Sequence, residues 1–483
     1  MDELSQPKKI HVIGVAGSVM GGMACLLSEQ GHHVEGSDRD CYPPMSTRLE
    51  RAGIHVHLGF DGARFNENPP DIVLVGNITS RDNPEAVAMR KLGIPHMSLP
   101  EMLNAMLLRE RKSLTIAGTH GKTTTTSMVL WLLQSARKEP GFMVGGIPMG
   151  FETGFKGGEG EFFVLEADEY DTAYFDKRPK FVHYLPDGGI LTSVEFDHAD
   201  IYPDFEAIKK AFRTYTRLFP DDAPLWVHAG NQEAMDTVAA AGGRARLLKY
   251  GIAEEEPGCD LDAAAYDVKL AQGSTPSTFK LRIFGEELGT FSLPAPGRHN
   301  IWNATAAVAL VHQQGVEAGA IKEALAKFPG VHRRQELRGV VEGIRVIQDY
   351  AHHPTAVRET IRAIRAQFPD QKLWALFEAE SNTSRRNLFQ ESYVAAFEDS
   401  DEVVFVKPLE KNDNLPPEER LDAGKLASDL KSRGVHARFI PEPQEILNTL
   451  ISEAKSGDVI LFMSGRNFLG LPAKLVPMLE AKR

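Results

Sequence analysis

A strand, a glycine-rich loop and a helix follow one another around residue 120, and this arrangement constrains the fold more than any other feature of the chain. Residues 112–127 read KSLTIAGTHGKTTTTS. The β-branched and apolar run Leu114–Ala117 predicts a strand, and the apolar spacing that begins at Met128 predicts a helix. In such a loop the glycines let backbone N–H groups approach an anion, while the helix N-terminus adds partial positive charge. The stretch therefore predicts an α/β fold with a phosphate-binding loop.

The side chains of this loop add the chemistry of a nucleotide site. Lys122 is predicted to reach the outer phosphates of ATP, and Thr123 to ligate Mg²⁺. The loop is shorter than the common pattern G-x-x-x-x-G-K-[ST], because Ile116 stands where that pattern has a glycine. A glycine- and threonine-rich turn before an ordinary helix is the structural alternative. The loop residues predicted to bind ATP are Gly118, Thr119, His120, Gly121, Lys122, Thr123 and Thr124.

Length and composition indicate a large globular protein with several cores. At 483 residues the chain exceeds the size at which one hydrophobic core keeps growing, so about three domains are expected. Three cysteines, without metal-type spacing, indicate reduced thiols and a cytoplasmic protein. No apolar run reaches the ~18 residues of a membrane span, and no signal peptide precedes the first predicted strand. The net charge of −12 argues against nucleic acid as a partner.

Three α/β segments follow one another along the sequence. Residues 1–109 alternate strand and helix patterns, which predicts a Rossmann-like parallel sheet. Residues 110–330 predict a central P-loop ATPase domain, with antiparallel strands from Tyr266 to Leu293 where apolar positions recur with period two. Residues 331–483 predict a third, Rossmann-like unit. Its strands are expected at Val340–Gln348, Leu373–Phe377, Val403–Val406 and Val459–Met463.

A second glycine-containing loop follows the first predicted strand. Residues 14–24 read GVAGSVMGGMA, and Asp38 closes the next strand. This is the context of a dinucleotide fingerprint, but Ala16 and Val19 stand where G-x-G-x-x-G has glycines. A redox cofactor is therefore a minor alternative, and a tight turn without a ligand is the structural one. Asp38 and the polar turn Gly76–Ser80 are expected at the carboxyl ends of strands, where ligands of such sheets bind.

Carboxylates and a histidine supply candidate metal ligands. The apolar run at 162–165 ends in three carboxylates, of which Glu166 and Glu169 are rival candidates. Carboxylate oxygens suit Mg²⁺. ATP alone does not need a histidine ligand, so His198 predicts a second metal ion. The spacing does not decide between Glu166 and Glu169, and a lone histidine is more often structural.

Polar side chains further along the chain suit other parts of a nucleotide. Residues 297–307 read GRHNIWNATAA and open an alanine-rich helix. An asparagine on such a helix can offer both a donor and an acceptor to an adenine edge. Arg334 suits a transferring phosphoryl group, since a guanidinium forks onto paired oxygens, although an Arg-Arg pair is also ordinary surface charge. Asp349 ends a predicted strand.

These motifs, in this order and over the whole chain, resemble those of the Mur ligases, which join amino acids or peptides to UDP-N-acetylmuramate. The resemblance implies three domains around one site, with ATP as co-substrate and two Mg²⁺ ions. It implies Thr123, Glu166 and His198 as metal ligands, and Lys209 is the nearest candidate for a carbamylated lysine found in some branches. The adenine contacts that it implies are His299, Asn300 and Asn303, with Asp349 on the ribose or phosphate side. The implied UDP-sugar contacts are Gly14, Ala16, Gly17, Ser18, Met20, Asp38, Asn77 and Ser80.

The C-terminal motifs bear on the acceptor within the same resemblance. Residues 351–356 read AHHPTA, which is similar to the branch that accepts L-alanyl-γ-D-glutamyl-meso-diaminopimelate, whereas the L-alanine branch typically reads GHHPTE. The tripeptide branch usually has arginine where this chain has Glu380, so Arg385 or Arg386 is expected to bind a peptide carboxylate instead. The implied peptide contacts are His353, Ser381, Asn382, Arg385 and Arg386.

The activity that the resemblance implies is ATP-dependent amide formation in recycling of peptidoglycan. The lactyl carboxylate of UDP-N-acetylmuramate would attack the γ-phosphate of ATP, and the tripeptide amine would then displace phosphate from the acyl phosphate. Lys122, His198 and Arg334 are predicted to carry the catalysis. The alternatives are ligation of L-alanine, a P-loop kinase or ATPase without the ligase step, and a non-catalytic nucleotide-sugar binder. UDP-N-acetylmuramate and the tripeptide are the expected partners of a monomer or weak homo-oligomer.

Overall fold

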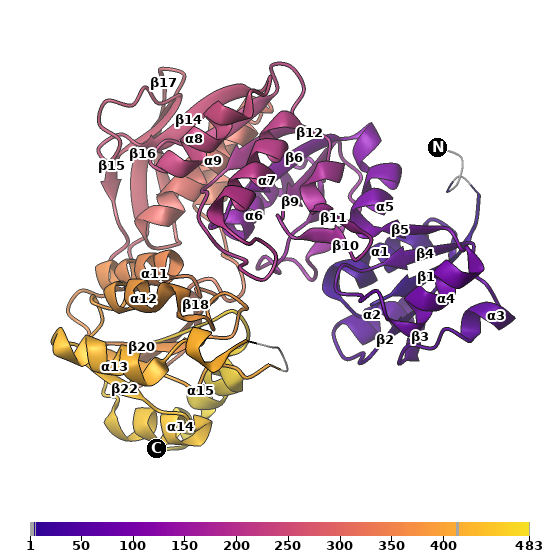
Figure 1. Ribbon diagram of the computed structural model, residues 1–483. Coiled ribbons are helices and arrows are strands. Elements are labelled where there is room, and N and C mark those ends of the chain that lie inside the picture. Colours follow the sequence, from indigo (N-terminus) through magenta and orange to yellow (C-terminus); the bar gives the residue numbers. More distant parts are fainter. Residues whose placement is uncertain (1–3, 5, 412–414, 483) are drawn as a thin grey trace.

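Three large sheets follow one another along the chain, each flanked by helices (Figure 1). The computed structural model describes residues 4, 6–411 and 415–482. The N-terminal and C-terminal parts both attach to the central part and lie apart from each other in Figure 1. This mixed α/β architecture with largely parallel sheets is the predicted fold class. Among the described residues, no helix is both long and apolar enough to span a bilayer.

The N-terminal sheet is parallel, with strand order β3-β2-β1-β4-β5. The order reverses between β1 and β4, so the loop after β1 lies at a topological switch point, where such sheets bind ligands. Its strands are β1 Lys9–Ile13, β2 His33–Asp38, β3 His55–Leu58, β4 Ile72–Val75 and β5 His96–Ser98. Its helices are α1 Ser18–Glu29, α2 Met45–Arg51, α3 Arg64–Glu67, α4 Pro84–Leu92 and α5 Leu99–Met106.

The central sheet has ten strands, in the order β17-β16-β15-β14-β13-β12-β6-β9-β7-β8. The antiparallel strands predicted between Tyr266 and Leu293 are confirmed as β15 Ala263–Lys269, β16 Ser277–Ile283 and β17 Glu286–Leu293. The other strands are β6 Lys112–Ala117, β7 Gly141–Met143, β8 Phe155–Lys156, β9 Phe162–Glu166, β12 Pro186–Leu191, β13 Pro224–His228 and β14 Arg246–Ile252, with a separate hairpin of β10 Asp171–Ala173 and β11 Asp176–Pro179. The helices are α6 Lys122–Ser135, α7 Phe205–Arg217, α8 Gln232–Ala241, α9 Arg298–Gln313 and α10 Ala318–Leu325.

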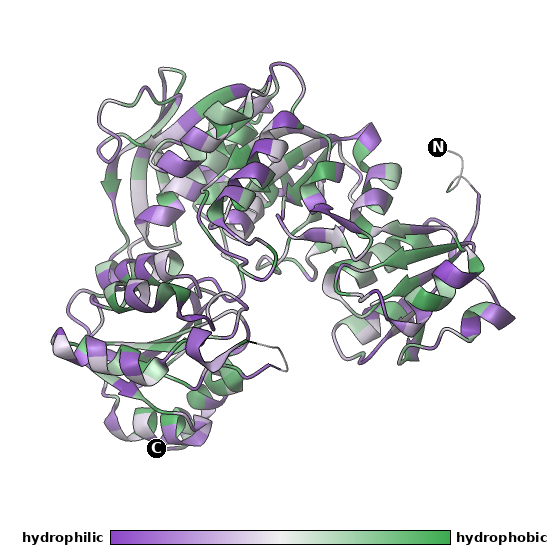
Figure 2. Cartoon of the chain, in the orientation of Figure 1, coloured by the Kyte–Doolittle hydropathy of each residue, from purple (hydrophilic) through white to green (hydrophobic). Residues whose placement is uncertain are grey.

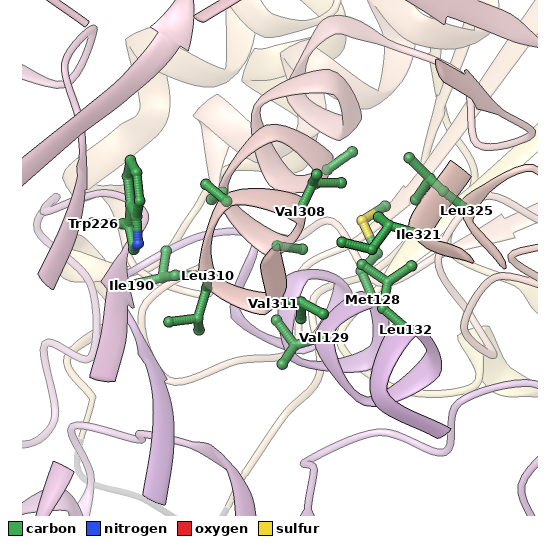
Figure 3. Close-up of a cluster of buried hydrophobic side chains, with 14 of the residues drawn as sticks. Met128, Val129, Leu132, Ile190, Trp226, Val308, Leu310, Val311, Ile321 and Leu325 are labelled. Atoms are coloured by element: carbon green, nitrogen blue, oxygen red, sulfur yellow. The ribbon is translucent and has the colours of Figure 1, made fainter. Parts of the chain in front are cut away.

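Helices α6 and α9 pack against each other in the central core (Figure 3). Helix α9 is rich in buried alanine, and these small side chains let its backbone approach α6 closely. Figure 3 shows Val129 of α6 beside Val311 of α9. This packing fixes the first turns of the two helices, which carry the predicted phosphate and adenine contacts.

A second hydrophobic cluster joins the N-terminal and central parts into one body. Met23 of α1 is fully buried with Phe155 and Phe163 of the central sheet. A Cβ atom on Gly22 would lie 2.8 Å from Phe155, so glycine is needed where α1 packs on β8. Because apolar burial crosses this boundary, the two parts are expected to move together.

The C-terminal sheet has the order β18-β19-β23-β20-β21-β22 and is parallel except for β18. Alternate residues of its strands lie in two separate clusters, one on each face, and hydrophobic residues gather on the strands in Figure 2. The strands are β18 Glu336–Val341, β19 Ile344–Asp349, β20 Leu373–Glu378, β21 Glu402–Phe405, β22 His436–Phe439 and β23 Val459–Ser464. The helices are α11 Pro354–Gln367, α12 Gln390–Ala396, α13 Ala423–Ser432, α14 Pro443–Glu453 and α15 Leu471–Ala481.

The single strand predicted over Val340–Gln348 is wrong. The chain turns back at Glu342 and Gly343, which have φ of 50° and 82°, and β18 pairs antiparallel with β19. Two consecutive residues with positive φ form the tight turn that fits the twist of a hairpin. The apolar residues on both sides of the turn concealed it in the sequence.

Candidate active site

A cavity of about 880 Å³ lies between the central and C-terminal parts of the molecule. The phosphate loop, the ends of β9 and β12, and the first turn of α9 form its central side. The segment 328–337 and the loop after β19 form its C-terminal side. Most of the residues predicted to bind ATP, to bind metal or to take part in catalysis lie along this cavity. They are Thr119, His120, Gly121, Lys122, Thr123, Thr124, Glu166, His198, His299, Asn300, Asn303, Arg334 and Asp349.

The glycines of the phosphate loop are required by their surroundings. Gly118 and Gly121 have φ of 129° and 81°, which side chains rarely adopt. A Cβ on Gly118 would lie 2.2 Å from Thr192 Oγ1, and one on Gly121 would lie 2.7 Å from Asn303 Oδ1. The loop therefore lies directly against both the β12 strand end and the predicted adenine helix.

Lys122 and His198 both bond to the buried carboxylate of Glu169. Lys122 Nζ lies 2.8 Å from Glu169 Oε2, and His198 Nε2 lies 3.1 Å from Glu169 Oε1. Burial favours the neutral imidazole, but the hydrogen bond with Glu169 and the charge of Asp197 raise the pKa of His198 to about 9. His198 has φ of 55°, an uncommon backbone conformation for a non-glycine residue and one that clusters at functional sites. Its ring lies 4.3 Å from that of Tyr170.

Thr123 and Glu166 form a second, adjacent pair. Thr123 Oγ1 donates to Glu166 Oε1 at 2.9 Å, and Arg334 Nη2 donates to the same hydroxyl at 3.2 Å. Burial raises the pKa of Glu166, because its surroundings do not compensate the carboxylate charge fully. A buried carboxylate beside a helix-start hydroxyl fits a hard cation such as Mg²⁺. The rival candidates thus occupy different positions, with Glu166 near Thr123 and Glu169 near His198.

The predicted adenine contacts already bond to one another. Asn303 Nδ2 lies 3.3 Å from Asn300 Oδ1, and Asn300 Nδ2 lies 3.1 Å from Gln335 Oε1. His299 Nδ1 is buried and has no hydrogen-bond partner among the described residues. Asp349 accepts from the backbone N of Gln335 and of Ala351 at 2.7 and 2.6 Å, so this carboxylate ties the interdomain segment to β19.

The loop after β1 does not line the cavity. Ala16 N donates to Asp38 Oδ2 at 2.9 Å, so Asp38 fixes the loop that leads into α1. Gly14 has φ of 85°. Gly17, Ser18, Asn77 and Ser80 are exposed beside it, whereas the Met20 side chain belongs to the core. The predicted UDP-sugar contacts therefore lie apart from the cavity, on the N-terminal domain.

The residues predicted to contact the peptide divide into two groups. His353 and Ser381 line the cavity, whereas Asn382, Arg385 and Arg386 do not. Arg385 is buried, with Nη1 donating to Leu409 O at 3.3 Å. Arg386 Nη1 bonds to Glu419 at 2.9 Å.

Sequence reasoning missed two features of the site. Glu195 lines the cavity and accepts a hydrogen bond from Thr355 Oγ1 of the C-terminal part at 2.7 Å. Its position directly after the β12 strand end was the available signal. Arg466 Nε lies 3.4 Å from buried Glu380, so a cation does stand beside this glutamate.

Lys209, the candidate for carbamylation, lies on α7, and its ammonium pairs with Glu233.

Comparison with known proteins places these features in one family. Three domain descriptions match: the Mur ligase family catalytic domain at residues 9–111, the Mur ligase middle domain at 116–311, and the Mur ligase glutamate ligase domain at 333–466. The UDP-N-acetylmuramate–L-alanyl-γ-D-glutamyl-meso-2,6-diaminoheptandioate ligase of Escherichia coli is 36% identical over 98% of this chain and 99% of its own.

Other relatives show the breadth of the similarity. The UDP-N-acetylmuramate–L-alanine ligase of Sulfurihydrogenibium is 33% identical over 98% of each chain. A murein peptide ligase structure from Psychrobacter arcticus is 32% identical and superposes with a TM-score of 0.70 over 97% of this chain and 98% of its own. The motifs, the three-part fold and these relatives agree, and the chain belongs to the Mur ligase family.

Proposed function

We propose that this protein is the ATP-dependent ligase that joins L-alanyl-γ-D-glutamyl-meso-diaminopimelate to UDP-N-acetylmuramate. The observation that carries the proposal is the cavity in which the phosphate loop, Glu166 and His198 face the 351–356 loop of the C-terminal domain. ATP supplies the energy, as in other Mur ligases. The chain's similarity to the E. coli ligase over almost its full length favours the tripeptide as acceptor.

The reaction follows from the positions of the cavity side chains. The lactyl carboxylate would attack the γ-phosphate beside Lys122, and Arg334 would neutralise charge on the transferring group. Bound Mg²⁺ would neutralise phosphate charge, with Thr123 and Glu166 at one position and Glu169 and His198 at another. The tripeptide amine would then attack the acyl phosphate, and the closed cavity would exclude water.

Each domain has its own task in this proposal. Residues 1–109 bind the UDP-sugar at the loop after β1, residues 110–330 bind ATP, and residues 331–483 bind the peptide and close the site. The switch-point position of the β1 loop supports the first assignment. The adenine helix, which packs beside the phosphate loop, supports the second.

The runner-up is ligation of free L-alanine. Relatives with that activity cover the chain as fully as the tripeptide ligases do, at somewhat lower identity. The sequence AHHPTA at 351–356 favours the tripeptide. Both acceptors share the acyl phosphate, so the catalytic assignments do not depend on the choice.

One assay tests the function. Phosphate release from ATP is measured with UDP-N-acetylmuramate and with tripeptide, L-alanine or no acceptor. We expect the highest kcat/KM with tripeptide and little release without an acceptor. A preference for L-alanine would show that the protein is an L-alanine ligase instead. ATP hydrolysis that does not depend on UDP-N-acetylmuramate would contradict the ligase assignment.

A further inference from the structure

Three potential metal donors from separate segments meet at the edge of the cavity. They are His120 of the phosphate loop, Glu195 after β12 and His353 at the start of α11. Their ligand atoms all lie within 4.8 Å of one another. None of the three belongs to the pairs to which we assign Mg²⁺.

The distances fit a small tetrahedral ion. His120 Nε2 and His353 Nδ1 lie 3.4 and 3.7 Å from Glu195 Oε2. Zinc–nitrogen and zinc–oxygen bonds of about 2.0–2.2 Å in a tetrahedral site separate neighbouring donors by about 3.3 Å. The two imidazole–carboxylate distances are therefore within a few tenths of an ångström of that geometry.

Hydrogen bonds with neighbouring groups orient His353 and Glu195, as hydrogen bonds commonly orient the ligands of metal sites in proteins. His353 Nε2 lies 3.2 Å from Phe196 O, which selects the tautomer with hydrogen on Nε2 and leaves an Nδ1 lone pair that can bind a cation. Thr355 Oγ1 donates to Glu195 at 2.7 Å. His353 caps the N-terminus of α11, where its Nδ1 accepts a long hydrogen bond of 3.3 Å from the backbone N of Thr355, and an ion would replace that contact.

The third donor has an unsatisfied atom. His120 Nε2 is buried and has no hydrogen-bond partner in the described part of the chain. The backbone N of His120 donates to Ser193 Oγ at 3.0 Å, and that of Glu195 to Thr119 Oγ1 at 2.8 Å, so both donors are held before any ion arrives. Two imidazoles and one carboxylate favour zinc over magnesium, which prefers oxygen ligands.

We propose that His120, Glu195 and His353 form a Zn²⁺ site that fastens the C-terminal domain to the phosphate loop. Three ligands leave the fourth position open to the cavity, where water or a substrate oxygen completes the shell. The ion links the central domain to His353 of the C-terminal domain, so domain opening requires its release. This site is separate from the positions proposed for the Mg²⁺ of the reaction.

Metal titration of the full chain tests this site. The protein is stripped with a chelator, excess Mg²⁺ is added to fill the catalytic positions, and Zn²⁺ is titrated against a chromophoric competitor. We expect one equivalent of Zn²⁺ to bind, and Co²⁺ to give the intense visible absorption of a low-coordinate site. His353→Gln and His120→Gln should each weaken the affinity at least about tenfold. His352→Gln is the matched control and should retain it.

Hydrogen exchange tests whether the ion holds the two domains together. Zn²⁺ should slow hydrogen exchange at residues 195–200 and 353–357 in the wild type and in His352→Gln, but not in His353→Gln. Absence of Zn²⁺ binding in Mg²⁺ would overturn the proposal. So would binding that His198→Ala removes and His353→Gln leaves intact, because the ion would then occupy the catalytic positions.

Discussion

At the scale of single residues, Lys122 carries the phosphate assignment. Its ammonium lies between Glu169 and the loop, and although burial opposes the charge, Glu169 and Asp168 raise the pKa of Lys122. We expect Lys122→Ala to lower kcat/KM for amide formation by about 10²–10³, as loss of a charge-stabilising group does elsewhere. Phosphate release and thermal unfolding are measured in parallel. Lys210→Ala, on exposed helix surface, is the control, and substantial activity in Lys122→Ala would refute the assignment.

Two sets of arginines are candidates to bind the carboxylates of the peptide. Arg385 is buried and Arg386 is paired with Glu419, whereas the exposed Arg466 is held by Glu380 next to Gly465, which lies close to His352 of the cavity. We expect Arg466→Ala to raise the KM for tripeptide about tenfold, consistent with about 1.5–3 kcal/mol for a bond to a charged group. The KM for ATP should not change. If the double variant Arg385→Ala and Arg386→Ala raises the tripeptide KM and Arg466→Ala does not, the sequence-based choice is correct.

At the scale of elements, most strands and helices were predictable, because their apolar positions recur with the period of each structure. The hairpin at Glu342 and Gly343 was not, since its apolar flanks read as one strand. The phosphate loop was predictable because its members are consecutive. The contact between Glu195 and Thr355 joins residues 160 positions apart, so only the packing of two domains creates it. Motifs within one loop therefore carry local chemistry, and sites shared by domains need the fold.

A charged network within the N-terminal sheet gives a prediction at the same scale. His11 of β1 is fully buried, with Nδ1 3.6 Å from Glu35 of β2 and Nε2 3.4 Å from Glu85 of α4. The contact with His11 lowers the pKa of Glu35 to about 2 from 4.5. A lowered carboxyl pKa contributes stability above pH 4.5, and this is lost as the pH falls toward 2.

We expect Glu35→Gln to destabilise the protein by about 1.5–3 kcal/mol near pH 6, because the charged contact with buried His11 is lost. The difference from wild type should shrink as the pH falls below 4.5. Denaturant unfolding at several pH values measures it. Glu67→Gln, an exposed carboxylate of α3, is the control. A constant difference at every pH would show that Glu35 is not coupled to His11.

At the scale of the whole molecule, the N-terminal and central domains share an apolar core, whereas polar contacts from the C-terminal domain reach the central site. The segment that connects the central domain to the C-terminal domain contains Gly330, Arg333 and Gln335, all with positive φ. The C-terminal domain is therefore the part expected to swing about this segment when substrates bind.

Small-angle scattering measures that closure. We expect the radius of gyration to fall when a non-hydrolysable ATP analogue and UDP-N-acetylmuramate are added together, and to change less with either alone, because the site needs both substrates to join the domains. Asn382→Ala removes the bond from Asn382 Nδ2 to Asp200, 2.7 Å long, and should widen the unliganded distribution while leaving the liganded radius close to that of the wild type. Zn²⁺ added without nucleotide should narrow the distribution of interatomic distances, because the ion would bind His353 of the C-terminal domain. His353→Gln should abolish that effect. An unchanged radius with both substrates would contradict the expected movement of the C-terminal domain.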